Sequence, residues 1–83
     1  MRLVAETTVA TADTYYEAAF VRLSEGAVQD AVAHLQRAMA LAPCQPKYAT
    51  ALAQVYDMLG ERERAGALLE QAIRLRRERL NRP

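Results

Sequence analysis

The chain has no tryptophan, a single cysteine and a single histidine among its 83 residues. One cysteine, Cys44, excludes an internal disulfide and a cysteine-cluster metal site, and His34 is too few to complete a zinc site with it. Catalytic triads and thiol catalysis also depend on histidine and cysteine side chains. With one of each in the chain, both kinds of catalysis lack partner groups here. We therefore expect a protein that is not an enzyme and that binds no metal and no cofactor.

Glycine is also rare, and Gly26, Gly60 and Gly66 each fall on an expected helix or at its end, so we expect no glycine-rich phosphate loop. No apolar run approaches the roughly 18 to 20 residues needed to cross a bilayer, and Glu6 interrupts the N-terminal apolar patch too early for a secretory signal. The net charge of +1 gives no general attraction to nucleic acid or to a membrane. These absences predict a soluble, cytoplasmic protein without a membrane partner.

What the chain does have is an internal repeat with a spacing of 34 residues. Five pairs of residues carry it: Gly26 and Gly60, Ala31 and Ala65, Leu35 and Leu69, Ala38 and Ala72, and Leu41 and Leu75. This period, with small and aliphatic residues at fixed offsets, is typical of a helix-turn-helix solenoid unit. The small residues have a physical reason, because helix axes about 8 to 10 Å apart need small side chains where the helices cross.

The apolar spacing predicts four helices in two antiparallel pairs. One continuous stripe covers residues 28–41, with apolar side chains at steps of three and four. Pro43 and Pro46 bracket its end, because proline cannot continue a helix and restricts the residue before it. The second unit has Arg77 in place of the first of these prolines. We therefore expect its last helix to run without a break over about residues 63–80.

The first eleven residues fit neither unit of the repeat. Their threonines and valines favour extended structure, while alanine and Glu6 keep a helix open. A disordered lead, a helical cap and an arm lying in a groove all remain open, and we expect a flexible or partly helical lead. For the first helix, Thr14 and Glu17 match a capping box, and Thr11 is an equally good N-cap.

On these residues the chain resembles the tetratricopeptide repeat (TPR) family. Ala19 and Ala53 stand at the small position of that family's first helix, and Ala31 and Ala65 at its tightest helix crossing. The resemblance implies an all-α fold in which two TPR helix-turn-helix hairpins form a short right-handed α-solenoid. It divides the chain into the lead (residues 1–11), a first repeat (12–45), a second repeat with an extended last helix (46–80) and a tail (81–83).

The resemblance also implies a protein or peptide partner on the concave surface lined by the first helix of each repeat. Mapping that surface gives a candidate partner-binding groove: Asp13, Tyr16, Phe20, Leu23, Lys47, Thr50, Gln54 and Asp57. The family's carboxylate clamp needs Lys and Asn where this chain has Tyr16 and Phe20, so we do not expect it here. The remaining apolar strip suits an amphipathic helix or a hydrophobic segment, although packing within the chain explains Tyr16 and Phe20 equally well.

Two repeats are fewer than the three or more that usually bury one another's faces. The last helix carries too many apolar residues for the outer helix of a finished stack, and four of them form a candidate outer interface: Leu68, Ile73, Leu75 and Leu80. Two function hypotheses follow. One is an interaction adaptor or small chaperone-like module that binds a partner's helix or peptide, and the other is a self-assembling homo-oligomer.

Five arginines lie in the last ten residues. They have no interleaved aromatic side chains for stacking on bases, and cations are favoured at a helix C-terminus by the helix dipole. We therefore do not expect a nucleic acid partner, whereas an acidic protein partner would use the same arginines. Alanine and arginine dominate the composition while lysine occurs only as Lys47, which suggests a bacterial source.

Overall fold

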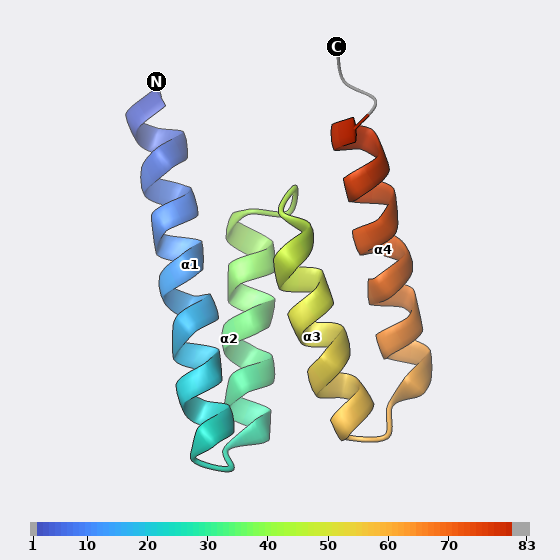
Figure 1. The fold of residues 1–83 in the computed structure, drawn as a ribbon. Coiled ribbons are helices and arrows are strands. Elements are labelled where there is room, and N and C mark those ends of the chain that lie inside the picture. Colours follow the sequence, from blue (N-terminus) through green and yellow to red (C-terminus); the bar gives the residue numbers. More distant parts are fainter. Residues whose placement is uncertain (1, 81–83) are drawn as a thin grey trace.

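Four helices follow one another in the computed structural model, which describes the backbone of residues 2–80 and the side chains of residues 8–80. The helices are α1 (Arg2–Ser24), α2 (Val28–Leu41), α3 (Pro46–Met58) and α4 (Arg62–Leu80). Each helix packs against its neighbours in the sequence, and the four form an antiparallel row (Figure 1). The all-α class expected from the sequence is confirmed, and α2 and α4 lie where the apolar spacing predicts them.

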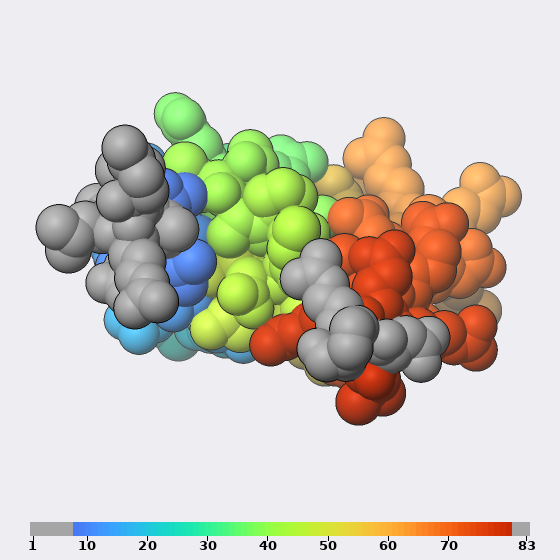
Figure 2. Space-filling view, turned by 90° about the horizontal axis from the view of Figure 1, so that it is seen from above, coloured from blue at the N-terminus to red at the C-terminus, as the bar shows by residue number. Residues whose placement is uncertain are grey.

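The outer helices of the row are also the longest, with 23 residues in α1 and 19 in α4. Both project beyond α2 and α3 at the same end of the molecule (Figure 1). Seen from that end, the connector between α2 and α3 lies between the two outer helices (Figure 2).

The start of the first helix differs from the expectation. Residues 2–11 are helical and continue into the first repeat. The capping box is wrong, because Thr14 lies inside α1 and its hydroxyl donates to the carbonyl oxygen of Ala10 at 3.0 Å. A threonine bonded to the carbonyl four residues earlier needs no helix end to satisfy its hydroxyl. The expected tail, residues 81–83, lies outside the described residues.

Both hairpins turn at a glycine with the same backbone conformation. Gly26 and Gly60 have φ angles of 80° and 79°, in the left-handed region that glycine enters without a Cβ penalty. After each turn an amide N–H reaches back five residues, from Ala27 to the carbonyl oxygen of Arg22 at 2.8 Å and from Glu61 to that of Tyr56 at 2.9 Å. The 34-residue repeat therefore holds at the level of the helix-capping hydrogen bonds.

Small side chains line the contacts between the helices. Ala19, Ala31, Ala53 and Ala65 are at most 5% exposed and belong to one hydrophobic cluster that spans both repeats. Leu35 is fully buried in the same cluster. The residues that define the repeat are thus the residues that let the helices approach one another.

Candidate protein-binding site

Asp13 on α1 and Lys47 on α3 form an ion pair between the first helices of the two repeats, with 2.8 Å between Oδ1 and Nζ. The hydroxyl of Tyr48 donates to the same Asp13 oxygen at 2.5 Å. The hydrogen bond from Lys47, and after it the one from Tyr48, lower the pKa of Asp13 below its ordinary value. Burial of the ring and the bond to Asp13 raise the pKa of the Tyr48 hydroxyl.

Aromatic rings surround this ion pair. The ring of Tyr16 lies 5.4 Å from that of Tyr48 and 4.9 Å from that of Phe20, with an edge-to-face angle of 88° to the latter. Lys47 Nζ lies 5.4 Å from the centroids of Tyr16 and Tyr48, within the range of a cation–π contact. Tyr16 therefore packs within the chain, while Phe20 keeps 44% of its surface exposed.

The other predicted groove residues lie in two settings. Leu23 is half-buried and packs against the main core, and the hydroxyl of Thr50 donates to the carbonyl oxygen of Pro46 within α3 at 3.0 Å. Gln54 and Asp57 are exposed and line an open cavity of about 320 Å³ between α3 and α4. The structure thus joins Asp13, Tyr16, Phe20 and Lys47 in one cluster and places Gln54 and Asp57 in a neighbouring one.

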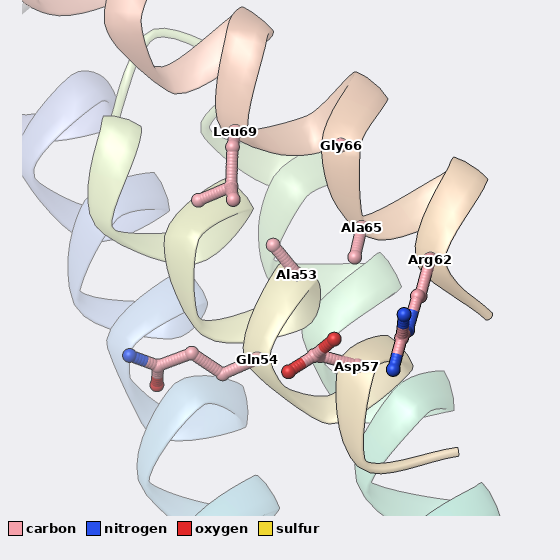
Figure 3. A pocket seen from close by; sticks show the side chains of 7 residues that line it. All are labelled: Ala53, Gln54, Asp57, Arg62, Ala65, Gly66 and Leu69. Carbon is pink, nitrogen blue, oxygen red and sulfur yellow. The ribbon is translucent and has the colours of Figure 1, made fainter. Parts of the chain in front are cut away.

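Sequence reasoning did not identify the cavity between α3 and α4 as a site. Its lining side chains come from both helices: Ala53, Gln54, Asp57, Arg62, Ala65, Gly66 and Leu69 (Figure 3). The residues 34 positions earlier are Ala19, Phe20, Leu23, Val28, Ala31, Val32 and Leu35. All of these except Phe20 belong to, or pack against, the core cluster that includes α3. In repeat 1, α3 packs on the equivalent surface. The cavity therefore lies where a further helix would pack on repeat 2.

Exposure differs strongly between equivalent positions of this surface. Leu69 is 45% exposed, although its equivalent in repeat 1 is fully buried. Gly66 is exposed where repeat 1 has a buried valine, and Ile73 is 47% exposed where repeat 1 has a half-buried methionine. No other element within the described residues covers these positions. We call the surface formed by Gly66, Leu69 and Ile73 the open face of α4.

The predicted outer interface divides between the interior and this surface. Leu68 and Leu75 are half-buried, and Leu68 packs against the core. Ile73 is exposed, and Leu80 is 84% exposed at the end of α4. Leu69 was missing from the predicted interface, although its alignment with Leu35 in the 34-residue repeat could have indicated it.

Residues 8–80 contain no group of three or more His, Cys, Asp or Glu side chains placed to hold a metal ion. Cys44 is an exposed free thiol, and the ring of His34 lies 6.0 Å from that of Tyr15. None of the described helices combines the length and the apolar character needed to cross a membrane.

Comparison with known proteins gives a family and a fold. A family model described as tetratricopeptide repeat matches residues 22–81. The chain is similar to the protein in the crystal structure of MamA, with a TM-score of 0.82 and 20% sequence identity over 86% of this chain. It spans 42% of the length of that MamA chain. A search of curated proteins found no match.

Proposed function

Since this chain belongs to the tetratricopeptide repeat family, whose helical repeats bind other proteins, we propose that it is a non-enzymatic interaction adaptor or small chaperone-like module. Its partner is a helix or an extended peptide of another protein, bound on the face shared by α1 and α3. Its exposed thiol, Cys44, suits a reducing compartment such as the cytoplasm.

The observation that carries this proposal is the exposed ring of Phe20. The ring is 44% exposed and is held edge-to-face by Tyr16. An aromatic side chain that is already fixed in place loses little conformational freedom when a partner covers it. Such anchors commonly provide a large part of the binding energy in protein interfaces.

The charges around Phe20 support an apolar partner segment over a terminal carboxylate. Lys47 is the sole lysine of the chain, and it is engaged by Asp13 and by two tyrosine rings. It is therefore already neutralised within the chain. The exposed side chains of Gln54 and Asp57 provide a polar rim that favours a partner with amide or basic groups at its edge.

A phage-displayed library of helical peptides, selected against the purified chain, tests the proposal. We expect Phe20→Asp to weaken the selected peptides by about tenfold or more, which corresponds to about 1.4 kcal/mol. The matched control is Val21→Asp, because Val21 is 54% exposed and the next residue of a helix points about 100° away. Helical circular dichroism checks the fold of both variants. Peptides that bind both variants equally, or a Phe20→Asp variant that unfolds, would contradict the assignment of Phe20 as a contact residue.

Self-association is a second candidate function, and the open face of α4 favours it. Leu69 and Ile73 remain about half exposed at positions that repeat 1 buries or half-buries. Fully burying a side chain of this size is worth about 1.5 to 3 kcal/mol. Two copies that cover each other's open face would recover part of that free energy.

A further inference from the structure

The two ends of the helical row have different chemistry. Thr14, Glu17 and Val21 are exposed on α1, while the residues 34 positions later on α3 are buried. In a head-to-tail stack, α1 of a second copy would pack on repeat 2 as α3 packs on repeat 1. This arrangement would place these three α1 residues on the open face of α4. Burying the Glu17 carboxylate against leucine and isoleucine is unfavourable without hydrogen-bonding partners. The exposed side of α1 therefore favours contact with solvent over packing against the open face of α4.

The open face of α4 is complementary to itself. Gly66, Leu69, Ile73 and Arg76 follow one another at steps of three and four, so they lie on one side of the helix. When a second copy lies antiparallel with a two-fold axis that crosses the open face at the level of residue 71, Leu69 faces Ile73 of the second copy. The same axis places Gly66 opposite Arg76 of the second copy. An isologous pairing of this kind makes each contact twice.

The cavity beside Gly66 holds one side chain of each charge, the Asp57 carboxylate and the Arg62 guanidinium. Its lining also includes the Gln54 side chain, and Figure 3 labels Asp57, Arg62 and Gln54 among the lining residues. A Cβ atom placed on Gly66 would meet nothing within 4 Å, so this wall of the cavity is open. Among the described residues, the Asp57 side chain has no ion pair or hydrogen bond. Arg62 lines the same cavity without pairing with Asp57, so an arginine from outside would meet an accessible, unpaired carboxylate.

We propose that two copies of this chain pair through the open faces of α4. The helices run antiparallel, Leu69 packs against Ile73 of the second copy, and Arg76 of each copy enters the cavity beside Asp57 of the other. This proposal rests on self-association, the second candidate function, and assigns the contact partner of each residue. Phe20 lies on α1, outside the pairing, so a variant there tests the other candidate.

The mass in solution is the first test. The chain has a mass of 9.2 kDa, and light scattering of the purified wild-type chain should give twice that value. Ile73→Arg should give the monomer mass with unchanged helical circular dichroism. Val21→Arg should stay dimeric, because Val21 is a similarly exposed β-branched residue on the opposite end of the row. A monomeric wild type would overturn self-association and the pairing together, while a dimer that survives Ile73→Arg would overturn the pairing alone.

A charge exchange tests the orientation of the two helices. Asp57→Arg and Arg76→Asp each place like charges together, so each should weaken the dimer by about tenfold or more. The double variant restores an arginine–aspartate pair with the positions exchanged, and it should recover most of the lost affinity. Such recovery requires residues 57 and 76 to meet across the interface. Additive loss in the double variant, or assemblies that keep growing with concentration, would contradict the antiparallel two-fold arrangement.

Discussion

Leu69 stands in repeat 2 where Leu35 stands in repeat 1, yet its side chain is 45% exposed while that of Leu35 is fully buried. The two residues have the same type, the same helical register and the same 34-residue frame. Their difference arises from α3, which covers the first and has no counterpart over the second among the described residues. The exposed fraction of Leu69 therefore shows how much of this side chain one more helix would bury at this end.

Alanine substitutions at these two leucines should have very different costs. Leu35→Ala leaves a cavity in a packed interior and should lower the free energy of unfolding by about 2 to 5 kcal/mol. Leu69→Ala removes a half-exposed side chain and should cost less than about 1 kcal/mol in the monomer. Urea unfolding of both variants in the Ile73→Arg background measures the costs without a contribution from self-association. Equal costs would mean that Leu69 is covered within the monomer.

Much of the fold was predictable because the repeat and the apolar period report packing directly. The stripe over residues 28–41 matches α2, since each apolar position faces the same neighbours. The start of α1 was not predictable from local preference. Threonines near residue 10 have modest helix propensity, but the preference is weak and Thr14 satisfies its hydroxyl inside the helix. Local patterns therefore located helix interiors better than this helix end.

The candidate site was predictable only in part for a related reason. Helical register indicates which residues share a face, and Asp13 and Lys47 do share one. That they neutralise each other depends on the distance between α1 and α3, which a 34-residue spacing does not contain. The cavity beside Asp57 likewise depends on which residues are left uncovered in the second repeat. A comparison of equivalent positions supplies this information once burial is known.

Acid should remove the contribution of Asp13 to stability. The folded-state pKa of Asp13 lies below the ordinary value of 3.8, so its contribution is present above that pH and is lost as the pH falls through the lowered pKa. Asp13→Asn should therefore lower the melting temperature at pH 7 and have a smaller effect once the pH falls below the lowered pKa of Asp13. The matched control is Glu17→Gln, an exposed carboxylate on the same helix, whose effect should stay small throughout. A deficit in Asp13→Asn that is independent of pH would show that the carboxylate charge is unimportant.

Replacing glycine by alanine should have opposite effects at two positions six residues apart. Gly60 has a φ of 79°, where an L-residue with a Cβ is strained, so Gly60→Ala should cost about 1 to 2 kcal/mol. Gly66 lies inside α4, and a Cβ there meets no atom within 4 Å. Gly66→Ala should therefore stabilise the monomer by up to about 1 kcal/mol, because alanine favours the helix over the unfolded chain. Thermal unfolding in the Ile73→Arg background measures both effects. Destabilisation by Gly66→Ala in this monomeric background would mean that the wall of the cavity is closer than its open geometry indicates.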